Sequence, residues 1–500
     1  MAITRAPDGR SLAQAGIFIA MPGDRLTALD ASFLHLEDAS AHMHVASVML
    51  FEGDPPPYDD LLDSIDRRLH LVPRYRQKLA FVPLGQGRPR WVDDPHLNLR
   101  YHVRSTALPS PGSEDQLRAL AGRVFAQQLD RDKPLWEIWI VEGLEDDRFA
   151  VLSKTHHSLV DGISGVDIVT VLFDTSPDPA APPDPGRRWL PRPLPSSAQL
   201  LGEALVERAT VPGEAMRTVR SVFRAPRQIA SGMMNAAAGI GAMAWAGMSP
   251  APPSPYNAPI GPHRRFTWVR TELADVKAIK NELGGTVNDV VLSAVAGALG
   301  RHLRRRGQRT DGLELKAMVP VSVRSDDQRG QLGNQVAAIY APLPVWCQEP
   351  VARLDIVREQ MKGLKEGGQA VGAQVLTELS GFAPPTVMGQ AARLMSRQRF
   401  FNLVVTNVPG PQFSLYLMGR KAIEPFPMVP LAKNQGLGIA IMSFDGKMNF
   451  GLVGDYDVLW DLDDLAHDLY ESLAELADAA GVELSTPRPP EAREELASLA

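Results

Sequence analysis

Several classes of protein are excluded by what the 500-residue sequence has little of. It contains one cysteine, Cys347, so it has no internal disulfide and no cysteine-based metal cluster, which fits a reducing compartment. We interpret Cys347 as a small, packed apolar residue. The formal charge of -6 provides no overall positive field that would hold nucleic acid. A nucleic-acid partner is therefore not expected.

Long, strongly hydrophobic runs are also lacking. The apolar run from Ala15 to Met21 is short and is followed at once by Asp24 and Arg25, which makes a poor secretory signal. The segment from Ile229 to Pro262 has no charged residue, and its first 21 residues are long enough to cross a bilayer. They are mostly Ala and Gly, however, with few of the residues that drive insertion. The arginines just upstream leave two interpretations open, contact with an anionic lipid surface or a solvated linker helix.

The overall composition is that of a globular protein with more than one domain. Hydrophobic residues make up 44% and charged residues 22% of the chain, and about 100 to 200 residues per domain predicts two to four domains. Proline-rich stretches at 176–193 and 250–263 indicate breaks between them. We predict a flexible extension at 1–23, a first domain at 24–175, a proline-rich and helical linker at 176–263, a second domain at 264–484 and a flexible tail at 485–500.

Alternating strand and helix patterns place both domains in the α/β (α+β) class. Apolar strand patterns occupy residues 44–51 and 137–142, and residues 59–71 have the spacing of a helix with one buried face that Pro73 ends. In the second half, residues 266–272 are predicted to form a strand and residues 273–283 a helix. Asp445-Gly446 is a strong signal for a β-hairpin turn.

The most informative stretch runs from Arg148 to Asp174 and is predicted to form a strand, a polar turn and a helix. This pattern places His156 and His157 at the end of a strand. Histidine accepts and returns a proton near neutral pH, so this pair is a candidate for acid–base chemistry. Because adjacent residues project differently, one histidine can face a cleft while the other packs.

The two histidines could also have a structural role, bind zinc or belong to a serine triad. A histidine at a strand end is more often a structural hydrogen-bonding residue than a catalyst. Zinc binding is disfavoured because adjacent histidines lack helical ligand spacing, and a serine triad is disfavoured because Ser158 has no glycine-flanked elbow. Asp161 and Gly162 strengthen the functional interpretation, since the aspartate can fix the loop and the glycine allows close approach of a substrate.

The sequence HHSLVDG, residues 156–162, matches the His-His-x-x-x-Asp-Gly signature of CoA-dependent acyltransferases, and the chain resembles the bacterial wax ester synthase/diacylglycerol acyltransferase family. LTALDASFLHLED at 26–38 and DRDKPLW at 130–136 resemble blocks of that family. Further similar blocks cover the second half, so the resemblance extends from about residue 24 to 480; they are GGTVNDVVLSAVAGAL at 284–299, MVPVSVR at 318–324, GNQVAAI at 333–339, TNVPGP at 406–411 and SFDGKMNFGLVGDYD at 443–457.

The resemblance implies a fold and a role for each site residue. It implies two chloramphenicol-acetyltransferase-like domains, each a mixed sheet with flanking helices, joined by a long helical crossover and enclosing a tunnel. His157 would be the general base and His156 a supporting residue, while Asp161 orders the loop and Gly162 keeps the channel open. Asn288 and Asp289 are taken as site-supporting residues. From the residues alone a structural role remains open for this pair, because Thr286 can cap a helix that starts there.

The implied activity is transfer of a long acyl chain from acyl-CoA to diacylglycerol, which forms triacylglycerol; fatty alcohols, which give wax esters, are the other acceptor. No metal or redox cofactor is required. The expected location is the cytoplasm, at the inner membrane leaflet or at lipid droplets. Two alternatives remain, a condensation-type enzyme with a carrier-bound acyl donor and a non-catalytic lipid-droplet binding protein.

Overall fold

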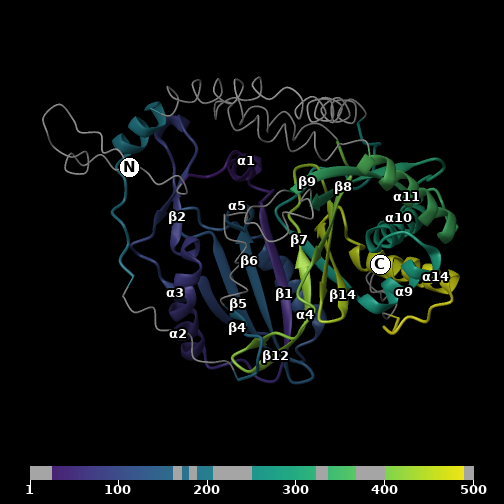
Figure 1. The fold of residues 1–500 in the computed structure, drawn as a ribbon, viewed down its shortest axis with the longest axis horizontal. Coiled ribbons are helices and arrows are strands. Elements are labelled where there is room, and N and C mark those ends of the chain that lie inside the picture. The colour runs from purple at the N-terminus through teal and green to yellow at the C-terminus, as the bar shows by residue number, and fades with distance from the viewer. Residues whose placement is uncertain are drawn as a thin grey trace, which may run out of the picture.

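Two six-stranded mixed β-sheets with flanking helices form the body of the protein (Figure 1). The computed structural model describes residues 25–160, 172–178, 189–206, 250–322, 336–366 and 400–488. The predicted tail at 485–500 and extension at 1–23 lie largely or wholly outside these ranges. Of the predicted linker at 176–263, residues 176–178, 189–206 and 250–263 are described, and residues 197–206 among them are helical.

The first sheet has the order β11-β12-β1-β6-β5-β4. Its strands are β1 (His44–Glu52), β4 (Val103–Ala107), β5 (Trp136–Leu144), β6 (Arg148–His156), β11 (Tyr416–Leu417) and β12 (Arg420–Met428). β4 and β5 are parallel, whereas β5, β6 and β1 are antiparallel neighbours. The register of β1 and β6 pairs His44 with His156, and this pairing brings two histidines together at one end of the sheet.

Short elements of the first half cover this sheet. They are α1 (Ala28–Leu36), α2 (Tyr58–Arg68), α3 (Leu99–His102), α4 (Glu114–Ala126), α5 (His157–Val160), β2 (Gln77–Ala80), β3 (Arg90–Asp93) and 3-10 turns at Leu69–Leu71, Pro73–Arg76 and Pro83–Gly85. α2 buries Leu61, Leu62 and Ile65, the face that the spacing predicts. It ends at Arg68, and Pro73 opens a 3-10 turn because its fixed φ suits a first helical position.

The second sheet has the order β7-β14-β13-β10-β8-β9. Its strands are β7 (Arg264–Glu272), β8 (Glu314–Ser322), β9 (Val336–Pro344), β10 (Leu403–Pro409), β13 (Leu437–Phe444) and β14 (Lys447–Asp455), and its helices are α9 (Leu273–Leu283), α10 (Val287–Arg305), α11 (Pro350–Glu366) and α14 (Leu462–Ala480). The predicted helix at 273–283 is confirmed. The hairpin at Asp445-Gly446 is also confirmed, with positive φ at both residues.

Strand β10 includes most of the TNVPGP block. It continues to Pro409, which pairs with Ser443 of the parallel neighbour β13. The chain leaves the sheet at Gly410, where a Cβ atom would overlap the carbonyl oxygen of Ser443. Glycine is thus required by close backbone approach.

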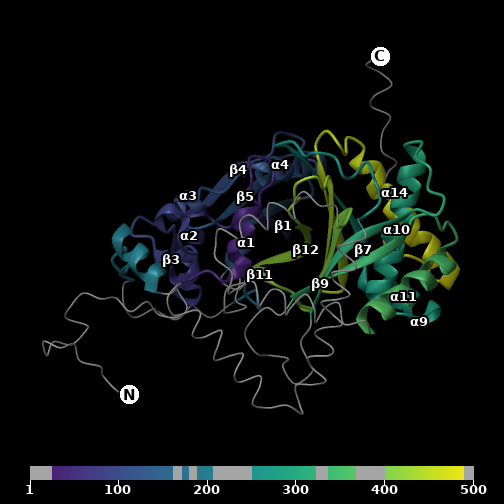
Figure 2. The same ribbon diagram turned by 90° about the horizontal axis from the view of Figure 1, so that it is seen from above.

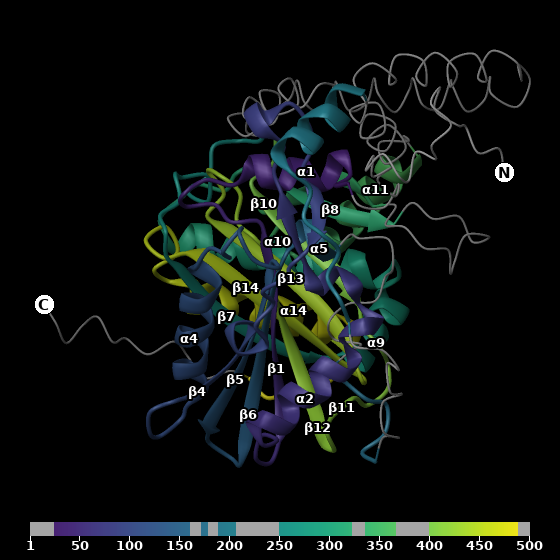
Figure 3. The same ribbon diagram turned by 90° about the vertical axis from the view of Figure 1, so that its left-hand side faces the viewer.

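The second half of the chain contributes two strands to the first sheet, which the sequence does not indicate. β11 and β12 lie within the predicted second domain, yet β12 pairs antiparallel with β1 and extends the first sheet (Figure 3). This pairing satisfies the backbone groups of β1 on a side that would otherwise be an open edge. The domain limits themselves remain a prediction, but the sheets do not follow them strictly.

An apolar cluster joins the two halves where α4, β7 and β12 meet (Figure 2). Trp268 of β7 stacks on Phe426 of β12, with ring centroids 4.2 Å apart. At its edge, Arg270 bonds Glu114 at 2.7 Å and Glu424 at 2.8 Å. The first half and the second half therefore share one core here.

Among the described helices, none is by itself both long and apolar enough to span a bilayer. The pair α9 and α10 passes that test only together, across a 96° bend. Most of α10 is buried in the core, so the apolar character of this pair has a packing explanation.

Candidate active site

The His156-His157 pair lies where β6 ends and α5 begins. The main-chain N–H of His156 donates to Leu135 O at 3.0 Å, and that of His157 donates to Met43 O at 2.8 Å. The His156 side chain is 1% exposed, whereas His157 is half-buried. The two adjacent rings thus occupy different environments, as the sequence predicts.

The ring of His156 is held on both sides by neighbouring groups. The main-chain N–H of Ser158 donates to His156 Nδ1 at 3.1 Å, and Ser158 Oγ lies 2.7 Å from the same nitrogen. Because Nδ1 accepts from a backbone N–H, the proton of a neutral ring must reside on Nε2. His156 Nε2 lies 3.2 Å from Glu37 Oε1, close but poorly aligned for a hydrogen bond. These contacts fix the orientation of the His156 ring, so its geometry is that of a positioning residue.

Glu37 follows α1 and is the buried anion of the site. Its side chain is 1% exposed; Oε1 accepts the Met43 N–H at 2.8 Å, and Arg131 donates to Oε2. Burial alone would raise the pKa of Glu37, but the His156 ring, followed by Arg131, outweighs burial and holds that pKa well below its usual range. Glu37 is therefore a carboxylate at neutral pH.

A second buried histidine completes this cluster. His44 Nε2 lies 3.6 Å from Glu37 Oε1, and the rings of His44 and His156 meet edge to face with centroids 5.8 Å apart. Burial, and then the positive charge of Lys154, holds the pKa of His44 well below its ordinary value. His44 is consequently neutral and contributes shape and polarity rather than charge.

His157 is the more accessible histidine, and its ring stacks on Phe33 of α1, with centroids 4.0 Å apart and planes 24° apart. Its backbone is tied to the buried anion through Met43, because Met43 donates its N–H to Glu37 and accepts the N–H of His157. The position of His157 is therefore coupled to Glu37 by two backbone hydrogen bonds and to Phe33 by ring packing.

Asp161 and Gly162 lie outside the described residues. Asn288 and Asp289 lie at the start of α10, and the described contacts do not join them to the two histidines. Asn288 is exposed and accepts from Asn407 Nδ2 at 2.7 Å, which links it to the TNVPGP block. Asp289 forms a capping box with Thr286, whose N–H donates to its carboxylate at 2.8 Å. The contacts of Asp289 are those of a helix cap.

Sequence reasoning missed Glu37, Phe33, Met43 and Ser158 as site residues. Glu37 and Phe33 belong to a block noted only for its resemblance, and Ser158 was considered only as a nucleophile. A carboxylate directly after a helix and shortly before two closely spaced histidines, His42 and His44, was the available signal for Glu37. Among the described residues, no group of three or more His, Cys, Asp and Glu side chains is placed to hold a metal ion.

Comparison with known proteins gives consistent matches along the chain. Residues 26–291 match the wax ester synthase/diacylglycerol acyltransferase catalytic domain, and residues 332–477 match the C-terminal domain of the same family. The probable diacylglycerol O-acyltransferase tgs1 of Mycobacterium tuberculosis is 34% identical over 457 residues, which cover 91% of this chain and 96% of that protein.

Solved structures agree with this match. The wax ester synthase/diacylglycerol acyltransferase from Marinobacter aquaeolei VT8 is similar with a TM-score of 0.63 and 27% identity, covering 92% of this chain and 100% of the other. The starter condensation domain of rhizomide synthetase RzmA, at 12% identity, a TM-score of 0.53 and coverage of 93% and 97%, shares the fold. The predicted fold class is thereby confirmed, and the chain belongs to the wax ester synthase/diacylglycerol acyltransferase family.

Proposed function

We propose that this protein transfers a long-chain acyl group from acyl-CoA to the free hydroxyl of diacylglycerol and so forms triacylglycerol. Membership of the family and the activity named for the tgs1 relative support this assignment. The observation that carries it is the contrast within the histidine pair. His156 is buried with both ring nitrogens beside polar partners, while His157 is half-buried on a fixed backbone.

His157 acts as the general base. It takes the proton of the acceptor hydroxyl as that oxygen attacks the thioester carbonyl carbon. The tetrahedral intermediate then collapses, the carbon–sulfur bond breaks, and the imidazolium returns the proton to the departing CoA thiolate. The products are one ester and one CoA thiol, with no covalent acyl-enzyme, metal or redox cofactor required. Such proton transfer contributes about 10² to 10⁴ in rate.

Three surrounding groups hold this base in place. Phe33 fixes the plane of the His157 ring, and the Met43 carbonyl fixes its backbone. Glu37 holds the Met43 N–H and lies against His156. Asp161 and Gly162 complete this arrangement as loop-ordering and channel residues. Asn288 and Asp289 have a supporting role at the start of α10, where Asp289 caps the helix and Asn288 binds Asn407.

The apolar tails of both substrates point to a lipid interface. We place the enzyme in the cytoplasm, peripherally bound to the inner membrane leaflet or to lipid droplets, from which diacylglycerol would enter the site. Fatty alcohols are a second acceptor in this proposal, because they offer the same primary hydroxyl chemistry and a single apolar chain.

The test is release of CoA thiol from palmitoyl-CoA by purified protein with dioleoylglycerol, with hexadecanol and without acceptor, accompanied by identification of the ester. His157→Ala should lower acceptor-dependent turnover by a factor of about 10² or more. The matched control is His96→Ala, because His96 is exposed and lies in the same half of the chain. His96→Ala should retain full turnover.

Two outcomes would contradict the proposal. A folded His157→Ala variant with wild-type turnover would remove His157 as the base. No ester with either acceptor in detergent or in vesicles would favour a carrier-bound acyl donor or a binding role.

A further inference from the structure

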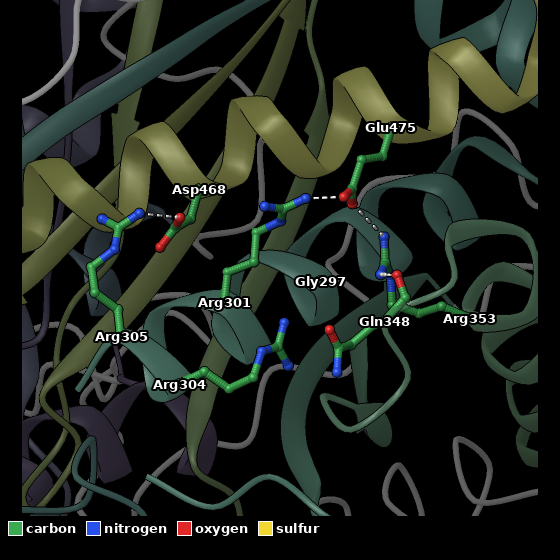
Figure 4. A pocket seen from close by; sticks show the side chains of 8 residues that line it. All are labelled: Gly297, Arg301, Arg304, Arg305, Gln348, Arg353, Asp468 and Glu475. Atoms are coloured by element: carbon green, nitrogen blue, oxygen red, sulfur yellow. Dashed lines mark hydrogen bonds and ion pairs between the residues drawn. The ribbon is translucent and has the colours of Figure 1, made fainter. Parts of the chain in front are cut away.

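A polar pocket on the second half of the chain has a composition unlike that of a lipid site. It is a cavity of about 310 Å³ lined by Gly297, Arg301, Arg304, Arg305, Gln348, Arg353, Asp468 and Glu475 (Figure 4). These residues come from α10, α14, the start of α11 and the segment just before it, on the side of the second sheet away from α5 (Figure 1). The pocket is therefore separate from the histidine site.

Its deepest cation is Arg353, which is 1% exposed. The guanidinium donates to Ser293 O at 3.0 Å, to the carbonyls of Cys347 and Gln348 at 3.2 Å and to Ser472 Oγ at 3.2 Å, all of them neutral acceptors. Burial lowers its pKa to about 10, so it remains charged at neutral pH. A buried charge held mainly by neutral groups is costly unless an anion approaches it.

The carboxylates of the pocket do not balance its arginines. Glu475 is shared, because it pairs with Arg301 and also lies 3.6 Å from Arg353. Asp468 bonds Arg305 at 2.7 Å, and Asp464, outside the lining, lies 3.6 Å from the same arginine. The lining thus holds four guanidinium groups, Arg301, Arg304, Arg305 and Arg353, against two carboxylates.

Among the four arginines of the pocket, Arg304 makes the fewest described polar contacts. Its one described hydrogen bond is to Val345 O at 3.5 Å, the limit of such a contact, and no carboxylate of the described residues forms an ion pair with it. Burial lowers its pKa, and the charge of Arg301 lowers it further. Figure 4 shows its guanidinium below those of Arg301 and Arg353, pointing toward the side chain of Gln348. An anion placed there would meet several donors at once.

Two glycines of α10 allow close packing around the pocket. A Cβ atom at Gly297 would lie 2.6 Å from Arg353 Cζ, so only glycine lets the guanidinium pass against α10. At Gly300 a Cβ atom would overlap the carbonyl oxygen of Val345. Gly297 thus permits the close approach of Arg353 to α10, and Gly300 permits that of the Val345 carbonyl, which accepts from Arg304.

We propose that this pocket binds a phosphate group carrying two or more negative charges. The planar fork of arginine matches phosphate oxygens in bidentate geometry, and several forks converge here. The volume lies at the small end for ligand pockets, and no apolar side chain lines it, so it suits a headgroup and not an acyl chain. Its source is either a soluble phosphate compound or the headgroup of an anionic phospholipid.

The experiment measures binding of inorganic pyrophosphate by calorimetry, and of vesicles of phosphatidic acid in phosphatidylcholine by flotation, at fixed ionic strength. The variant is Arg304→Gln, and the matched control is Arg309→Gln, an arginine whose side chain is 93% exposed. Loss of a charge-assisted bidentate contact should weaken binding by about tenfold or more in Arg304→Gln only. Arg304→Lys, which keeps the charge and loses the fork, should fall between.

The two probes distinguish the two sources. Binding of pyrophosphate supports a soluble compound, and binding of phosphatidic acid vesicles alone, with none to phosphatidylcholine, supports a lipid headgroup. Equal weakening by Arg304→Gln and Arg309→Gln would mean general surface charge and would overturn the proposal, as would no binding of either probe. Turnover of palmitoyl-CoA should be unchanged in all three variants because the pocket is separate from the histidine site, so the result is independent of the acyl-transfer assignment.

Discussion

Replacing Glu37 by glutamine removes one buried negative charge while keeping the size of the side chain. Glu37 is 1% exposed and lies 3.2 Å from His156, and it also pairs with Arg131. Breaking a fully buried pair costs about 3 to 5 kcal/mol, but the Arg131 side chain is 34% exposed and can return to water. We therefore expect Glu37→Gln to lower the free energy of unfolding by about 1 to 3 kcal/mol at pH 7.

The loss of stability in Glu37→Gln should become smaller as the pH falls. The pKa of Glu37 in the folded protein lies below its unfolded value of about 4.3. Between these two pKa values the unfolded chain binds more protons than the folded protein. The stabilisation by Glu37 is therefore complete above the unfolded pKa and declines as the pH falls below it. The difference between wild type and Glu37→Gln should shrink by about 1.4 kcal/mol for each pH unit below about 4.3.

The assay is urea unfolding followed by tryptophan fluorescence between pH 7 and pH 3 for wild type, Glu37→Gln and Glu359→Gln. Glu359 is exposed on α11 and serves as the control, which should track wild type at every pH. A constant difference between wild type and Glu37→Gln across this range would refute the assignment of Glu37 as a carboxylate with a lowered pKa.

Three further substitutions test the packing and the site. Gly451→Ala should lower the free energy of unfolding in urea by about 1 to 3 kcal/mol, because its Cβ would overlap the carbonyl oxygen of Pro427. The control is Gly363→Ala on α11, which has open space around it and should be neutral or stabilising by up to about 1 kcal/mol. Thr286→Ala should cost about 1 kcal/mol in the same assay through loss of the α10 capping box, and an unchanged midpoint would contradict that role. Phe33→Leu should lower kcat several-fold, since it leaves the ring of His157 without its stacking partner, and should change the free energy of unfolding by no more than about 1.5 kcal/mol; unchanged kcat would show that this stacking is dispensable.

Local patterns predicted the parts of the fold that depend on neighbours in sequence. The helix at 273–283 and the hairpin at Asp445-Gly446 follow from apolar spacing and turn chemistry, and the strand end at His156 follows from the run of apolar residues before it. The pairing of β12 with β1 could not be predicted in this way, because it depends on two segments far apart in the chain. The same limit applies to Glu37, whose partners come from β6 and from the segment before β5.

The two functions of Glu37 can be separated, because charge and hydrogen bonding are carried by different contacts. Its charge matters to Arg131 and His156, whereas its Oε1 atom holds the Met43 N–H, and Met43 in turn holds the backbone of His157. Glutamine keeps an oxygen that can accept from Met43, but alanine does not. Glu37→Gln should therefore lose stability and keep most of kcat, while Glu37→Ala should lose both, with kcat falling at least about tenfold because a misplaced base transfers protons poorly. Equal kcat values for folded Glu37→Gln and Glu37→Ala, measured by CoA thiol release, would mean that Met43 does not transmit the position of Glu37 to His157.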